Sequence, residues 1–172
     1  TYVTGVAFAP DSKRLASVGF DRKLRVWDVE KRRQVYAIEA VQKTEVPDGV
    51  AALFAVSYST DGKRIATGSG VISESDNRDA ILGIWNAADG KDVLQIPTKA
   101  RRVSGLTFSP DGKRLFSAHY GVTLRVTDID TAKELPVAPE LKVAGTAVAL
   151  TADGKTAVTA SDDGLVRLWS VK

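Results

Sequence analysis

Large and small apolar residues alternate along the chain in a pattern that recurs four times. In each copy the larger residues stand eight, five and three positions before an aspartate that opens a turn. They are Val3, Val6 and Phe8; Leu53, Val56 and Tyr58; Val103, Leu106 and Phe108; and, after Gly145, Val148 and Leu150. The positions between them are small and uncharged. A strand of this kind is buried on both faces, with large residues of one sheet against small residues of the next.

Each turn aspartate is followed by further strand signals. The second strands are expected at 14–18, 64–68, 114–118 and 156–160, and the third strands end in L-R-V-W, L-G-I-W, L-R-V-T and V-R-L-W. A more polar fourth strand follows in the first three copies, at 34–38, 92–96 and about 134–137. The rising polarity predicts that this strand forms the outer edge of each sheet.

The spacing of the copies indicates the architecture. The turn aspartates are Asp11, Asp61, Asp111 and Asp153, of which the last two lie 42 residues apart. Four strands in about 42 residues are typical of one blade of a propeller. We therefore predict an all-β protein of four β-propeller blades of antiparallel strands, at about 1–40, 50–97, 101–138 and 143–172. The second copy carries eight extra residues, and we expect this insertion, Val71 to Arg78, to be a surface loop outside the sheet.

The pattern also predicts an incomplete ring. The fourth copy has no outer strand, so its third strand, Gly164 to Ser170, should show an unpaired edge. The two end blades should expose one face of large residues and one of small residues. Two copies could close head to tail, or the blades could belong to a longer propeller of about seven blades, with the rest elsewhere.

The repeated motifs resemble those of the WD-repeat family over essentially the whole chain. The matching segments are F-A-P-D-S-K-R-L-A-S and its three counterparts, with D-R-K-L-R-V-W-D, D-A-I-L-G-I-W-N and D-G-L-V-R-L-W-S. The family implies a Gly-His pair whose histidine bonds an aspartate of the turn between the second and third strands. Asp21, Asp79 and Asp163 match that aspartate in the first, second and fourth copies, and Gly121 stands at its position in the third. The Gly-His pair is absent from the sequence. We expect these aspartates to cap turn N–H groups instead.

Composition narrows the chemistry without identifying a partner. The chain has 172 residues, no cysteine and a net charge of +3. Disulfides, thiolate metal sites and cysteine nucleophiles are thus excluded. The absence of cysteine does not decide the cellular compartment. No apolar run approaches the length of a membrane helix. The modest charge makes nucleic acid an unfavoured partner.

Three groups of charged residues are candidates for binding a metal ion or an anionic partner. Asp21, Asp79 and Asp163 could form a metal-binding ring, but turn capping explains them. Glu74, Asp76 and Asp79 lack a calcium-loop spacing. A basic arc recurs beside the first turn and is explained as solvated turn residues; it consists of Lys13, Arg14, Lys63, Arg64, Lys113, Arg114 and Lys155. We expect neither metal nor cofactor, with an anionic surface as the alternative reading of the basic arc.

The resemblance implies a non-catalytic scaffold for protein partners, which bind through the loops at one end of the blades. Aromatic and arginine side chains dominate such interfaces. His119 is expected in an exposed loop there, and no nucleophile and carboxylate accompany it. The alternatives are an accessory propeller of a larger enzyme or signalling protein, or a binder of an anionic surface or nucleic acid. The residues expected to bind a partner are Tyr2, Phe20, Arg102, His119, Tyr120 and Asp162, with the strand entry Leu53 near them.

Overall fold

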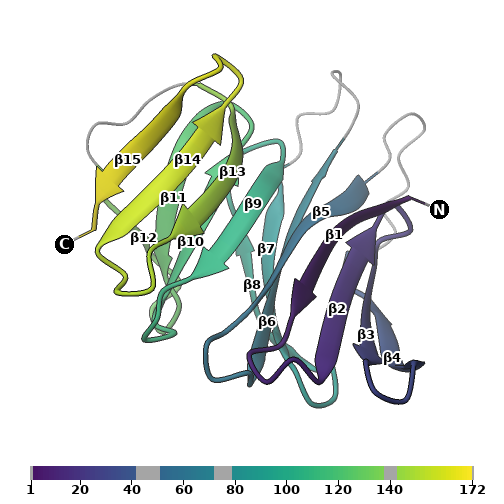
Figure 1. The fold of residues 1–172 in the computed structure, drawn as a ribbon. Helices are drawn as coiled ribbons and strands as arrows, with labels where there is room; N and C mark the ends of the chain where they lie inside the picture. The colour runs from purple at the N-terminus through teal and green to yellow at the C-terminus, as the bar shows by residue number, and fades with distance from the viewer. Residues whose placement is uncertain (1, 42–50, 72–78, 138–142, 172) are drawn as a thin grey trace.

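The structure, a computed structural model, describes residues 2–41, 51–71, 79–137 and 143–171. These residues form strands in four antiparallel sheets, and none of them lies in a helix. The predicted all-β class and the open set of propeller blades are therefore confirmed (Figure 1). We number the sheets as blades 1 to 4 in chain order.

Each blade is a meander in which consecutive strands pair. Blade 1 contains β1 (Val3–Phe8), β2 (Arg14–Gly19), β3 (Lys23–Asp28) and β4 (Arg33–Glu39). Blade 2 contains β5 (Ala51–Tyr58), β6 (Arg64–Val71), β7 (Ile81–Asn86) and β8 (Asp92–Pro97). Blade 3 contains β9 (Val103–Phe108), β10 (Arg114–His119), β11 (Val122–Asp128) and β12 (Glu134–Leu135). Blade 4 contains β13 (Gly145–Leu150), β14 (Thr156–Ser161) and β15 (Val166–Ser170).

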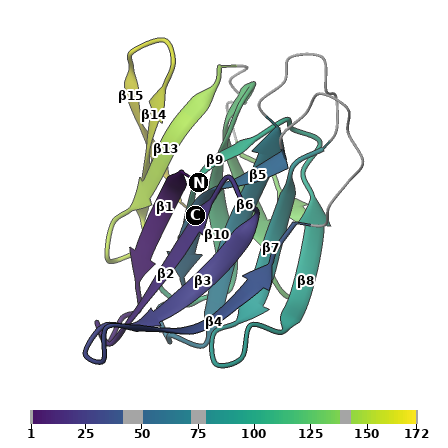
Figure 2. The ribbon, with the colours of Figure 1, turned by 90° about the vertical axis from the view of Figure 1, so that its right-hand side faces the viewer.

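The first strands of the blades lie side by side and carry the packing between sheets (Figures 1 and 2). Gly5 faces blade 2 so closely that a Cβ there would lie 3.4 Å from a methyl group of Val56. A Cβ on Gly105 would lie 3.1 Å from the Ala147 Cα of blade 4. Gly5 thus meets a large residue of the next blade, as predicted, whereas Gly105 lies against the backbone at the small residue Ala147. Three apolar cores result, one between each pair of neighbouring blades.

A tryptophan of the third strand is tied to a hydroxyl group of the second strand in three blades. The indole N–H donates to that hydroxyl oxygen at 2.8–2.9 Å, in the pairs Trp27–Ser17, Trp85–Thr67 and Trp169–Thr159. Blade 3 has Thr127 and Ser117 at the corresponding positions. Its outer half is therefore built differently from those of the other blades.

The first residue of the expected insertion loop belongs to a strand. Val71 is the last residue of β6, where it pairs with Ala51, so placing it in a loop outside the sheet was wrong. The two residues that lengthen β6 continue the antiparallel pairing with the long β5. The rest of the insertion, residues 72–78, lies outside the described residues.

The two end blades expose apolar side chains. Large residues of β1 are exposed on blade 1, namely Val3, Val6 and Phe8. In blade 4, Ala147 and Ala149 are exposed on β13, and Val166 and Leu168 on β15. Within the described part of blade 4, β15 is the sheet edge. These surfaces match the predicted open arrangement.

Candidate partner-binding face

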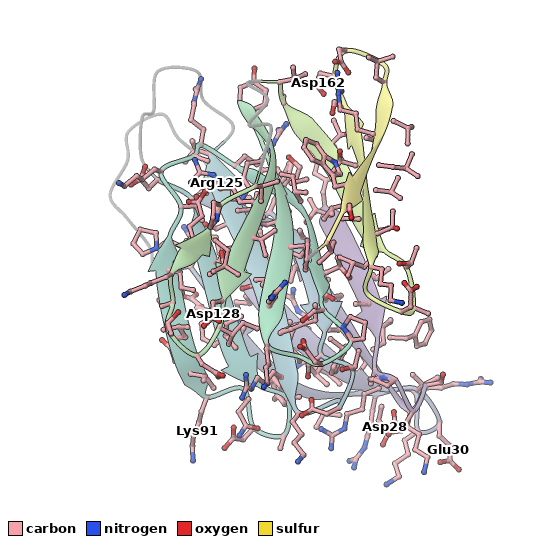
Figure 3. The ribbon with its side chains drawn as sticks, turned by 90° about the vertical axis from the view of Figure 1, so that its left-hand side faces the viewer. Asp28, Glu30, Lys91, Arg125, Asp128 and Asp162 are labelled. Atoms are coloured by element: carbon pink, nitrogen blue, oxygen red, sulfur yellow. The ribbon has the colours of Figure 1, made fainter. Side chains whose placement is uncertain are left out.

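In blades 1, 3 and 4, two sequence positions meet at the end of the molecule where the second strand turns into the third. The N–H of the residue after the second strand donates to the carbonyl oxygen of the residue before the first strand. This bond joins Phe20 to Tyr2 at 3.1 Å, Tyr120 to Arg102 at 2.9 Å and Asp162 to Ala144 at 3.0 Å. We call this the loop end. Figure 3 shows it by Asp162, with Asp28, Glu30 and Lys91 at the opposite, turn end.

Four of the predicted partner-binding residues come together at the loop end. Tyr2 packs edge-on against Phe20 with ring centres 5.7 Å apart, and Phe20 packs similarly against Phe54 at 5.9 Å. The Arg102 guanidinium lies 5.3 Å from the ring centres of both Phe54 and Tyr120. We call these five residues the aromatic–arginine row. It crosses blades 1, 2 and 3 as one chain of ring and cation–π contacts.

Phe54 is the member that sequence reasoning missed, and Leu53 was the wrong choice at this strand entry. Leu53 is buried in the core between blades 1 and 2. The pairing of β5 with β6 skips a residue between Leu53 and Ala55, so Phe54 is the extra residue of a β-bulge. A bulge redirects the side chains around it. The three-residue step in the spacing of the apolar positions was the available signal, because an unbroken strand would step by two.

The bulges surround a depression at the centre of the loop end. Thr4, Phe54, Ser104 and Thr146 are the residues that the strand pairings skip in blades 1 to 4. All four line an opening of about 320 Å³ together with Phe20 and Arg102. The bulged residue of every blade therefore faces the same space, beside the aromatic–arginine row.

A glycine in blade 2 positions Arg102. Gly70 forms an isolated bridge with Arg102, and the Val71 N–H donates to the Arg101 carbonyl oxygen at 3.1 Å. A Cβ on Gly70 would lie 2.6–2.8 Å from the side chain and Cα of Arg102. Such distances are not reached by real Cβ atoms, so Arg102 can lie here only because residue 70 has no side chain.

The placement predicted for His119 was wrong. The residue ends β10 and is fully buried, so it is not an exposed contact in a loop. Its Nε2 lies 2.7 Å from the Ser117 hydroxyl oxygen. Burial, with a smaller contribution from the charge of Arg125, lowers the pKa of His119 to about 3, so the ring is neutral at neutral pH. The available signal was that the matching positions of the other copies carry small residues, Gly19, Ser69 and Ser161.

Asp162 occupies the position in blade 4 that Phe20 and Tyr120 occupy in their blades. It is exposed, and it lies outside the series of ring contacts. The structure therefore gathers Tyr2, Phe20, Arg102 and Tyr120, places Asp162 at the same end and buries His119.

The turn aspartates act partly as predicted. Asp21 and Asp163 accept the N–H of the second residue after them, at 3.3 and 3.1 Å. Each also binds an arginine four residues later, and that hydrogen bond is the largest cause of their lowered pKa values. Asp79 is exposed, and none of the described residues is hydrogen-bonded to it. No described group of three or more acidic or histidine side chains could hold a metal ion.

The basic arc lies at the turn end, and its backbone is used by the fold. Each of its lysine N–H groups donates to the turn aspartate two residues earlier at 2.9–3.0 Å. Each lysine carbonyl oxygen also accepts a hydrogen bond from the N–H of the residue that follows the third strand. In blades 2 to 4 a serine or threonine hydroxyl donates to that aspartate and lowers its pKa. The recurrence of the turn aspartates thus follows from a repeated structural turn, in which the lysines take part through their backbone.

Comparison with known proteins finds similarity to one family and to several individual proteins. Residues 1–28 and 142–170 match a family described as "WD domain, G-beta repeat". Among curated proteins, the chain is 30% identical over 107 residues to the target of rapamycin complex subunit wat1 of Schizosaccharomyces pombe, covering 59% of this chain and 33% of that protein. It is 27% identical to the WD repeat-containing protein slp1 of the same yeast, covering 98% of this chain and 33% of that protein.

A third relative is human cilia- and flagella-associated protein 52, which is 24% identical over 77% of this chain and 18% of its own length. The chain thus spans a third or less of these three relatives. Within the described residues, no helix has the length and apolarity needed to span a membrane.

Proposed function

As this chain belongs to the WD-repeat family, we propose that it is a non-catalytic scaffold that binds a protein partner through the aromatic–arginine row. The single observation that carries the proposal is the continuous contact from Tyr2 to Tyr120 across three blades. A few residues supply most of the binding energy of a protein interface, and tryptophan, tyrosine and arginine are enriched among them. A row held on three blades offers such anchors at fixed spacing.

The surroundings of the row favour a specific kind of partner segment. Tyr2 is 77% exposed and Tyr120 44%, while Phe20, Phe54 and Arg102 are half-buried between them. Arg102 lies against two rings, so its charge is presented beside apolar surface. This arrangement suits a segment that carries an apolar side chain next to a carboxylate. The depression next to the row gives room for the apolar side chain.

The wider role of the protein is part of the same proposal. One relative is named as the subunit of a complex, and a comparable place within a multiprotein assembly fits a chain of repeated blades. A function as the accessory propeller of a larger enzyme or signalling protein is compatible with the same face. A role in binding an anionic surface would instead use the turn end, where the basic arc lies.

Site-specific photo-cross-linking tests the proposal. A benzophenone amino acid is introduced at Tyr2, and in a matched control at the exposed Lys63 of the turn end, in cells of the source organism. We expect one protein to be cross-linked and enriched from the Tyr2 position over the Lys63 position. The captured protein is then purified and its binding to the unmodified chain measured. Cross-linking to the same protein from Lys63 alone would move the interface to the turn end and overturn the proposal.

A further inference from the structure

Blade 3 contains an opening of about 230 Å³ on its side toward blade 2. Leu82 and Ile96 of blade 2 form its apolar wall, and Thr127, Arg125 and His119 line it from blade 3. The remaining lining residues are Pro97, Thr98, Lys99, Ala132 and Glu134. A water molecule occupies about 30 Å³ in the liquid, whereas drug-sized ligands take pockets above roughly 300 Å³. The opening therefore has the size of a molecule with one or two rings.

The opening corresponds to a tryptophan that blade 3 lacks. Trp85 of blade 2 is buried in the core shared with blade 1, and Trp169 of blade 4 is buried in the core shared with blade 3. Each tryptophan thus packs against the preceding blade. Thr127 holds the corresponding position in blade 3, facing blade 2. The wall that would contact an indole ring is therefore present without the ring.

A second replacement in blade 3 changes the role of Arg125. In blades 1 and 4 the matching arginines, Arg25 and Arg167, bind the aspartate four residues earlier. In blade 3 the position of that aspartate is occupied by Gly121. Arg125 instead donates a hydrogen bond through Nη1 to Glu134 at 2.7 Å. Its Nε is buried and has no hydrogen-bond partner among the described residues. Figure 3 shows Arg125 on blade 3, between the two ends of the molecule.

The buried histidine supplies another unpaired nitrogen atom. Because no tryptophan donates to Ser117, its hydroxyl group pairs with His119 Nε2 instead. His119 Nδ1 is buried and has no partner in the described part of the chain. If the hydroxyl donates to Nε2, Nδ1 carries the proton and is a donor. Buried polar groups left unpaired cost free energy, which a suitable ligand recovers.

We propose that this opening binds a small aromatic carboxylate, with its ring against Leu82 and Ile96 and its carboxylate toward Arg125 Nε and His119 Nδ1. The apolar wall matches the ring that the missing tryptophan would supply. The charged lining groups are Lys99 and Arg125 against the single acid Glu134, which favours an anion. Both unpaired nitrogen atoms can donate to carboxylate oxygens.

Nuclear magnetic resonance of the full chain tests this assignment with indole-3-acetate as the probe. The arginine Nε–H signals are observed during titration, with indole alone and acetate alone as separate arms. We expect a saturable shift of the Arg125 signal with indole-3-acetate, binding about tenfold weaker with either fragment, and no comparable shift of Arg25. No saturable shift at millimolar concentration, or equal binding of indole alone, would contradict the proposal.

Two variants locate the site. Thr127→Trp fills the opening and should abolish binding of indole-3-acetate. Arg125→Lys removes the Nε donor without filling the opening, and should weaken binding about tenfold, whereas the matched control Arg25→Lys should leave it unchanged. If Thr127→Trp fails to fold, the comparison of Arg125→Lys with Arg25→Lys still tests where the ligand binds. Binding that survives Arg125→Lys unaltered would place the ligand elsewhere.

Discussion

The two ends of the molecule are built on opposite principles, although the same repeat produces both. At the turn end, every blade has an aspartate whose side chain accepts the lysine N–H two residues later. At the loop end, matching positions carry different side chains from blade to blade. The position nine residues after the turn aspartate is Phe20, Gly70, Tyr120 or Asp162.

This difference between the two ends distinguishes side chains that the fold requires from side chains that are available to bind a partner. A side chain that closes the same turn in each blade is required wherever the turn occurs, and its recurrence says nothing about a partner. Nine residues after the turn aspartate, at the loop end, the backbone makes the repeated bond, so the side chains at this position are not dictated by the blade, unlike the neighbouring Asp21 and Asp163. Their variation produces one aromatic–arginine row, which explains why the proposed interface lies there.

Lowering the pH should reveal the largest difference between the two ends in their effect on the free energy of unfolding. His119 has a pKa lowered from 6.5 to about 3 by burial, so below pH 6.5 the unfolded chain binds more protons than the folded chain. Its contribution to stability is complete above pH 6.5 and falls as the pH decreases, by about 3 kcal/mol at pH 4. Urea unfolding of the native chain at a series of pH values measures this loss.

Two variants test whether the loss of stability at low pH arises from His119 or from a turn aspartate. His119→Ser, which copies Ser69 and Ser161, should flatten the profile between pH 6.5 and pH 4. Asp111→Ala should leave that window unchanged, because the lowered pKa of Asp111 confines its contribution to lower pH, where the carboxylate becomes protonated. A profile unaffected by His119→Ser would refute the burial argument.

A side chain at Gly70 should disturb the loop end while leaving the turn end intact. Gly70→Val would place its Cβ within 2.8 Å of Arg102. The resulting displacement should cost about 2 kcal/mol in the free energy of unfolding and shift the signals of the row. Gly112→Val is the matched control for a turn-end glycine: a Cβ there meets nothing within 4 Å, although its positive φ causes local strain. Undisturbed Tyr120 and Phe54 signals in Gly70→Val would contradict the role given to Gly70.

Removal of one turn carboxylate should have a smaller effect. Asp111 accepts hydrogen bonds from the Ser109 hydroxyl group and the Lys113 N–H. Asp111→Ala should therefore reduce the free energy of unfolding by about 1 kcal/mol, measured by urea unfolding at pH 7. Asp111→Asn keeps an acceptor and should lose less. Equal losses in the two variants would show that these hydrogen bonds do not stabilise the turn.

The smallest effect on stability is expected in the row itself. Tyr2 is largely exposed, so Tyr2→Phe and Tyr2→Ala should each change the free energy of unfolding by roughly 0.5 kcal/mol or less. Thermal unfolding of both variants measures this. A loss of several kcal/mol in Tyr2→Ala would mean that the row is needed for folding and is not free to serve a partner.

Repetition made most of the fold predictable from the sequence. Strand order, the turn aspartates and the outer edges recur, so each copy supported the assignment of the others. Phe54 was missed because a bulge breaks the period-two rule, and its three-residue step was read as a regular strand. His119 was misplaced because β10 runs one residue farther than the predicted strand and the ring lies between blades. Contacts between blades, such as that of Gly70 with Arg102, have no signal within a single repeat.

The affinity of the chain for the partner captured by cross-linking tests the central claim most directly. The dissociation constant is compared between two triple variants. The loop-end variant carries Phe20→Ala, Arg102→Ala and Tyr120→Ala. The turn-end variant carries Lys13→Ala, Lys63→Ala and Lys113→Ala. The account predicts that the loop-end variant loses at least about a hundredfold in affinity while remaining folded, and that the turn-end variant changes by less than about threefold. The opposite ranking would place the interface on the basic arc and contradict the account.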